Sequence, residues 1–199
     1  MTYADRSGDA SQRMINRTTH ADALHQAGRR AEAEARFREA EEMQAENQPA
    51  YSLLYSVQGF QYCDLLLAAT ERAAWQCILG SAGLQPADFR IVPETPQRAV
   101  TDKFLSSHGD APCSAAHDAR RSGQDARAPQ IQSCRAVSQR AAQTLQWAEG
   151  NNLSLLSIAL NHLTLSRAAL YEAILEGSSL APCHKSLQHA VARGQRRAL

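Results

Sequence analysis

The sequence has few aromatic residues, because phenylalanine, tryptophan and tyrosine together make up only 6% of its 199 residues. Any hydrophobic core must therefore be built mostly from leucine and alanine. An excess of charge of one sign is also missing, since 21 basic residues face 20 acidic ones and leave a net charge of +1. The charge balance thus gives no global indication of a nucleic acid or an anionic membrane surface as a partner.

Long apolar runs are missing as well. The longest uninterrupted one covers residues 65–69, far short of the ~20 residues that a transmembrane helix needs. The first residues hold no apolar stretch of the kind found in secretion signals. We therefore expect no membrane partner and a cytoplasmic location.

Motifs for cofactors, metals and catalysis are also lacking. The five cysteines are an odd number at wide spacings without a C-x-x-C pair, so they encode neither a zinc site nor a disulfide framework. There is no G-x-x-x-x-G-K-[ST] and no G-x-G-x-x-G motif for binding nucleotides. No Ser or Cys, His and acid converge on neighbouring predicted elements. We expect no cofactor, no metal and no enzymatic activity.

The sequence is instead rich in helical periodicity. Apolar residues recur at spacings that match 3.6 residues per turn, and Gly or Pro interrupts the pattern at intervals. The spacing predicts helices over 9–27, 29–47, 50–68, 70–79, 133–149, 153–176 and 180–198. Thr70 is the predicted N-cap of the fourth, and no strand is convincing, so the expected fold class is all-α.

One segment interrupts this pattern. Residues 83–132 carry five of the seven prolines and lose the apolar periodicity. A patternless stretch of this length is too long for an ordinary loop inside a compact domain, so we interpret it as a disordered insert. The predicted organisation is helical repeats over 1–82, the insert over 83–132, and helical repeats over 133–199.

The predicted helices come in pairs, and a pattern of small and large residues recurs in them. The first pair has Ala21 and Leu24, a turn at Gly28, and then a triplet of Ala33, Phe37 and Ala40. Matching positions in later pairs are Tyr55, Gly59 and Tyr62, then Ala168, Tyr171, Leu187 and Ala190. Small residues at 21, 59 and 168 would let two helices approach closely, with a larger side chain beside each.

On these residues the chain resembles tetratricopeptide-repeat proteins over roughly 9–82 and 133–198. It also resembles bacterial repeat arrays that lie C-terminal to signal-transduction NTPases. The resemblance implies an antiparallel helix-turn-helix solenoid that binds a protein or peptide as a scaffold, or that forms the sensor part of a larger signalling protein. We expect a fragment of a longer array, whose uncapped ends would favour self-association. A plain helical bundle is the alternative fold.

Binding in such a scaffold would use polar side chains on the first helix of each pair. The candidates for contacting a partner are Asn16, His20, Gln58, Gln61, Asn161 and His162.

Two other functions stay open. The basic C-terminal helix, with Lys185, Arg193, Arg196 and Arg197, would serve a nucleic-acid-binding regulatory subunit, although the interleaved aromatic residues typical of such surfaces are missing. A hydrolase with a dispersed site is the other alternative, and a cysteine of perturbed pKa in a cleft would support it.

Overall fold

Local capping signals fix both ends of the first helix. In the computed structural model, which describes residues 8–81, 113–179 and 188, α2 spans Ala10–Gln26. The Asp9 carboxylate accepts hydrogen bonds from the backbone N–H groups of Ser11 (2.8 Å) and Gln12, which are among the donors that a helix start leaves unpaired. Gly28 follows with a φ of +77°, a conformation that glycine adopts at little cost. The prediction for this helix is confirmed.

The next helix was also placed correctly by its periodicity. Helix α3 spans Arg30–Asn47 and packs antiparallel to α2. The triplet Ala33, Phe37 and Ala40 is fully buried between them, at 0% exposure for each residue. A short 3-10 turn, η1 (Pro49–Tyr51), leads out of α3.

The region after η1 differs from the prediction. A single helix, α4 (Ser56–Ser81), replaces the two expected over 50–68 and 70–79. Thr70, the predicted N-cap, lies inside it, and its buried hydroxyl donates to the Gln130 carbonyl of α5 at 3.4 Å. A threonine can cap the start of a helix or lie in its interior. Here α5 supplies a hydrogen-bond acceptor for the hydroxyl, which favours the interior position.

The predicted insert also needs correction at its C-terminal end. Helix α5 spans Cys113–Gly150 and contains Pro129, whereas the sequence predicted disorder up to residue 132. Pro129 removes a backbone donor, but Ile131 and Cys134 close behind it pack in the core against α4 and α6. Tertiary packing therefore outweighs the local penalty of the proline. Residues 82–112 lie outside the described part of the chain.

Helix α6 (Leu155–Glu176) completes the described fold. Ser154 caps its start by accepting the Ser157 N–H, and Gly177 ends it with a φ of +68°. The prediction over 153–176 is confirmed. The helix expected over 180–198, with Leu187 and Ala190, falls outside the described residues except for Gln188.

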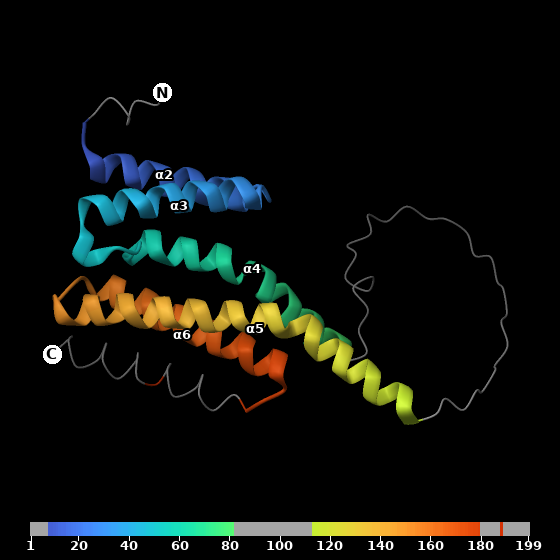
Figure 1. Ribbon diagram of the computed structural model, residues 1–199. Coiled ribbons are helices and arrows are strands. Elements are labelled where there is room, and N and C mark those ends of the chain that lie inside the picture. Colours follow the sequence, from blue (N-terminus) through green and yellow to red (C-terminus); the bar gives the residue numbers. More distant parts are fainter. Residues whose placement is uncertain (1–7, 82–112, 180–187, 189–199) are drawn as a thin grey trace, which may run out of the picture.

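In Figure 1, α2, α3 and α4 lie one below another in chain order, and α5 and α6 cross each other below α4. Helices α2 and α3 form one antiparallel pair, α5 and α6 form another, and α4 packs between the pairs. Ser56 at the start of α4 bonds to Ser157 near the start of α6. Helices α2, α4 and α6 therefore run in one direction, and α3 and α5 in the other. The described residues contain no strand, so this part of the chain is all-α.

Two hydrophobic clusters meet at α4. The first joins Tyr62 and Leu65 of α4 to the α2/α3 pair, and Phe37 stacks on the Tyr62 ring at 5.0 Å between centroids. The second joins Cys63 and Leu67 to the α5/α6 pair, including the predicted repeat residues Ala168 and Tyr171. The blocks predicted as 1–82 and 133–199 thus share a core through α4.

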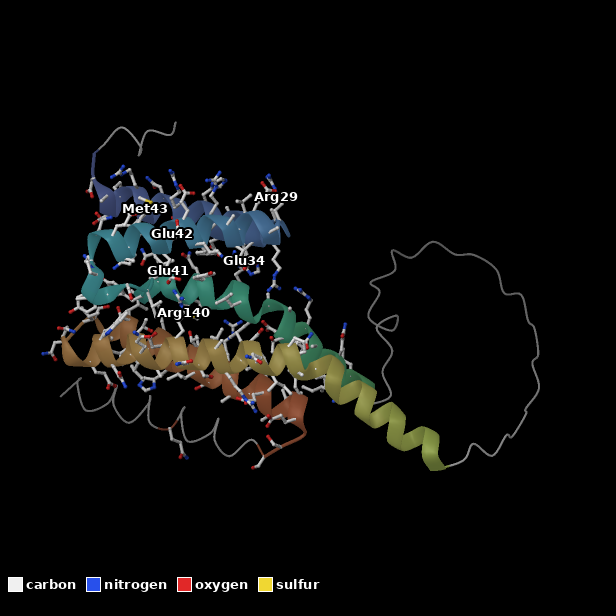
Figure 2. All side chains as sticks on the ribbon, viewed as in Figure 1. Arg29, Glu34, Glu41, Glu42, Met43 and Arg140 are labelled. Atoms are coloured by element: carbon white, nitrogen blue, oxygen red, sulfur yellow. The ribbon has the colours of Figure 1, made fainter. Side chains whose placement is uncertain are left out.

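A partly buried ion pair crosses this junction. Glu41 of α3 and Arg140 of α5 meet over α4 through two hydrogen bonds, one of them 3.0 Å long, and Figure 2 shows the two residues on either side of α4. The Arg140 guanidinium lies 4.8 Å from the Tyr62 ring centroid. Glu41 also accepts the Leu54 backbone N–H at 2.9 Å. Burial opposes the charge, yet Glu41 raises the pKa of Arg140 above its usual value.

Gly59 has a different role from the one the sequence suggested. A methyl group there would overlap the carbonyl of Leu54, whose carbon would lie at 2.9 Å. The close neighbour is therefore the turn into α4, rather than a paired helix.

We predict that Gly59→Ala lowers the free energy of unfolding by about 1–3 kcal/mol, because the backbone carbonyl of Leu54 would have to move. Urea unfolding monitored by circular dichroism measures the effect. Gly80→Ala is the matched control in the same helix, since a Cβ there meets nothing within 4 Å. Equal stability of both variants would contradict the close contact at Gly59.

Arg140→Met should cost about 3–5 kcal/mol, because it leaves the Glu41 carboxylate in a partly buried site without its cation. Adding Glu41→Gln removes that charge and keeps an oxygen for the Leu54 N–H. The double variant should therefore be more stable than Arg140→Met alone. Urea unfolding of Arg140→Met, Glu41→Gln and the double variant checks this, and strictly additive losses would contradict an energetic coupling of the pair.

Alkaline pH should weaken the fold through the buried thiols. Burial raises the pKa of Cys63 to about 11 and that of Cys134 to about 12, while unfolded cysteine titrates near ~8.5. Above about pH 9 the unfolded chain therefore binds fewer protons than the folded one. Stability should fall by about 1.4 kcal/mol per pH unit for each thiol. Urea midpoints at increasing pH test this, and Cys63→Ala with Cys134→Ala should flatten the slope.

Candidate functional site

Side-chain bonds align the three parallel helices α2, α4 and α6 along one side of the protein. The Gln61 amide of α4 donates to Asp22 of α2 at 3.3 Å. One turn further along each helix, His25 Nε2 of α2 lies 3.4 Å from an Asp64 oxygen of α4. These contacts show that Asp22 and His25 face α4 on the side that Gln61 and Asp64 share.

Arg167 continues this row of contacts onto α6. Its guanidinium reaches Asp64 at 2.7 Å and Glu71 at 3.1 Å, both on α4, and lies 5.9 Å from the Phe60 ring centroid. Burial disfavours the charge, but contacts with Tyr171 and Asp64 outweigh it and raise the pKa of Arg167. The guanidinium therefore stays charged and bridges two carboxylates that lie about two helical turns apart on α4.

Exposed apolar side chains extend the same side of these helices. Residues seven apart differ by only ~20° around a helix, so Ile15 shares a stripe with Asp22, and Val57 shares one with Asp64 and Glu71. Leu156 and Leu163 share a stripe with each other, and Arg167 follows Leu163 by one turn. The exposed fractions are 37% for Ile15, 40% for Val57, 55% for Leu156 and 43% for Leu163.

We name this surface the α2/α4/α6 face and define it by the residues just described. Its members are Ile15, Asp22 and His25 of α2; Val57, Gln61, Asp64 and Glu71 of α4; and Leu156, Leu163 and Arg167 of α6. Large apolar side chains gathered on one side of a protein mark interaction sites more often than scattered ones do.

A pocket of about 230 Å³ opens at the edge of this face, between the first turns of α2 and α4 and the end of α3. Its apolar walls are Met14, Ile15, Leu54 and Tyr55. Besides the Tyr55 hydroxyl, its polar lining consists of the Ser11 hydroxyl and the side-chain amides of Gln44, Gln48 and Gln58. Every lining side chain is therefore uncharged at neutral pH.

Hydrogen bonds hold the inner wall of this pocket in place. The buried Gln44 amide donates to Gln48 Oε1 at 3.0 Å and to the Tyr51 carbonyl at 2.9 Å. The Tyr55 hydroxyl donates to the same Gln48 oxygen at 3.4 Å. These bonds order the connection between α3 and α4, which forms one wall of the pocket.

Two of the six candidate residues from the sequence lie at this site. Gln58 lines the pocket, and Gln61 lies on the face with its bond to Asp22. Tyr55, expected as a repeat position in the core, is half-buried and lines the pocket. Its position just before α4 leaves it outside the two clusters.

Two further candidates lie on another side of α2. His20 is exposed and interacts electrostatically with Glu32 of α3. Its side chain therefore lies on the side of α2 that is next to α3. Asn16, half-buried, precedes it by one turn. Neither residue belongs to the α2/α4/α6 face, because both positions are rotated from the Ile15 stripe toward α3.

The last two candidates are buried on α6. Asn161 is 9% exposed and its Oδ1 accepts a 2.7 Å hydrogen bond from Thr144 of α5, while His162 is 7% exposed. The sequence placed these polar residues on a binding surface, but in the structure they lie inside. A polar residue on an apolar helix can lie on a binding surface or be buried. Only the neighbouring helix that packs against it decides which of the two occurs.

The apolar members of the face were missed by sequence reasoning. Val57, Leu156 and Leu163 have the same apolar character as core residues, so their type does not mark them as exposed. A usable signal was the seven-residue spacing of Val57, Asp64 and Glu71, which puts an apolar residue in line with two acids. Such a stripe is unsuited to a buried face.

The described residues offer little support for a catalytic or metal site. Burial raises the pKa of Cys63 and Cys134, so both thiols stay protonated at neutral pH and are poor nucleophiles. Across the described ranges, no three His, Cys, Asp or Glu residues gather in a way that would hold a metal ion. The four basic residues of the expected C-terminal helix lie outside those ranges.

Among the helices that the structure describes, none combines the length and the apolar character needed to cross a membrane. Comparison with known proteins gives no match to a family model, to a curated protein or to a solved structure. The function is therefore inferred from the geometry of the face and its pocket.

Proposed function

We propose that the protein is a non-catalytic helical scaffold that binds a segment of another protein on the α2/α4/α6 face. The observation that carries this proposal is the gathering of Ile15, Val57, Leu156 and Leu163, each more than a third exposed, on one side of three parallel helices. Burying such side chains against a partner is favourable by roughly 25 cal/mol per Å² of apolar area.

The way the face is built favours recognition by a preformed surface. Its helices are fixed from behind by two hydrophobic clusters that meet at α4. The bridges from Arg167 to Asp64 and Glu71 hold its charged side chains in place. A partner would not have to order these side chains on binding, which lowers the entropic cost of association.

The arrangement supports the tetratricopeptide-type solenoid as the architecture of this scaffold. Helices alternate in direction along the chain, α4 contacts both α2 and α6, and the small residues Ala21 and Ala168 are fully buried. In such a solenoid the first helices of successive repeats line one surface, and α2, α4 and α6 would have that role. We propose that this scaffold serves as the interaction or sensor part of a signalling protein.

We predict that random 12-residue peptides displayed on phage will be enriched on the immobilised full chain and will bind through this face. Leu156→Asp should weaken binding of the selected peptides at least tenfold, because it puts a charge among the apolar contacts. The readout is fluorescence anisotropy with synthetic versions of the selected peptides.

Leu155→Asp is the matched control for that experiment. Leu155 is 51% exposed and adjacent to Leu156, but it points about 100° away around α6. An acid is tolerated at the start of a helix in either position. Equal binding by the two variants, or no enrichment of any peptide, would contradict the proposed function.

A further inference from the structure

The pocket beside the face is the right size for one amino-acid side chain. Its volume of about 230 Å³ is below the ~300–1,000 Å³ of pockets that enclose drug-sized ligands. No charged side chain lines it; its apolar walls are Met14, Ile15, Leu54 and Tyr55. Of its polar lining, Gln44 and Gln48 already spend their side-chain groups on bonds within the protein. A carboxylate or an ammonium group would lose its hydration there without gaining an opposite charge, so the fitting side chain is apolar.

The rim of the pocket offers hydrogen bonds to a main chain. Among the described residues, neither the half-buried Gln58 amide nor the Ser11 hydroxyl has a hydrogen-bond partner. A helical segment pairs its own backbone groups internally, whereas an extended one presents them along its length. Unpaired amide and hydroxyl groups at the mouth of the pocket therefore suit an extended segment.

The charge on the face calls for a cation in the partner. The face carries three carboxylates, of Asp22, Asp64 and Glu71. The Arg167 guanidinium pairs with the last two, and the His25 imidazole lies 3.4 Å from Asp64. Asp22 receives one hydrogen bond, from the neutral Gln61 amide, and pairs with no cation among the described residues. A lysine or arginine of the partner would neutralise it.

The spacing between pocket and acid sets the spacing in the partner. Asp22 follows the pocket residue Ile15 by seven positions, which is about 10.5 Å along α2. An extended chain with three residues per turn rises about 3.1 Å per residue, so it returns to the same side after about 9.3 Å. The long side chain of lysine or arginine spans the small difference between these two distances.

We propose that the α2/α4/α6 face binds an extended peptide segment that inserts one apolar side chain into the pocket and sets a lysine or arginine, three residues away, against Asp22. This inference rests on the proposed function and specifies the chemistry of the partner. It commits to a basic, extended segment of another protein as the occupant.

Pooled synthetic peptides test this on the immobilised full chain. One pool fixes Leu-x-x-Lys and Lys-x-x-Leu, with x randomised among neutral residues. A second pool replaces the leucine by aspartate, a third replaces the lysine by glutamate, and a fourth separates leucine and lysine by seven positions, as a helix would require. We expect the first pool to be retained at least tenfold better than each of the others.

Two pairs of variants assign the contacts. Asp22→Asn should remove most of the preference for lysine over glutamate, while Glu42→Gln, an exposed acid of α3, should leave it unchanged. Ser11→Phe should fill the pocket and weaken retention of the first pool at least tenfold. Gln12→Phe, the neighbouring exposed position outside the pocket lining, should not. Circular dichroism checks that each variant is folded.

The outcomes separate this inference from the proposed function. Best retention of the fourth pool would identify a helical partner and overturn the extended one. Binding that Leu156→Asp abolishes but Asp22→Asn and Ser11→Phe leave intact would keep the face as a binding surface and overturn the specificity inferred here. Retention of no pool, together with no enrichment in the phage selection, would overturn both.

Discussion

The ion pair between Glu41 and Arg140 is the contact on which the placement of the helices depends. It joins α3 to α5 across α4, and the same carboxylate fixes the Leu54 N–H in the turn before α4. Tyr62 lies beneath the guanidinium and stacks on Phe37. Removing either charge leaves the other desolvated at the junction of two cores. This contact thus ties both helix pairs to α4 at the point where the two cores meet.

The geometry of the binding face follows from this junction rather than from the ion pairs on the face. Side chains in the row around Asp64 and Arg167 are 20–35% exposed, and pairs of that kind contribute ~0–1 kcal/mol each. Burial of residues such as Leu65 and Leu67, on the two sides of α4, contributes more, at ~1.5–3 kcal/mol each. The cores therefore position α2, α4 and α6, and the surface charges select what binds to them.

The pocket exists because helical packing is interrupted between α3 and α4. The chain leaves α3 through η1 and enters α4 at Ser56, whose φ of +57° is incompatible with a continuous helix. Gln44 and Gln48 satisfy the polar groups of this connection, which a helix would otherwise satisfy itself. A break in regular structure beside a rigid pair of helices thus leaves an uncharged recess at the edge of an acidic face.

Local sequence signals suffice to predict the helical class, the helices α2, α3 and α6, and the buried triplet around Phe37. Caps such as Asp9 and Gly177 and a 3.6-residue period are local signals, legible without knowing what lies nearby. Tertiary structure alone decided that Thr70 lies within a helix, that α5 continues through Pro129, and that Asn161 is buried while Leu156 is exposed. Each of these depends on a partner distant in the chain, and a residue's own type does not reveal that partner.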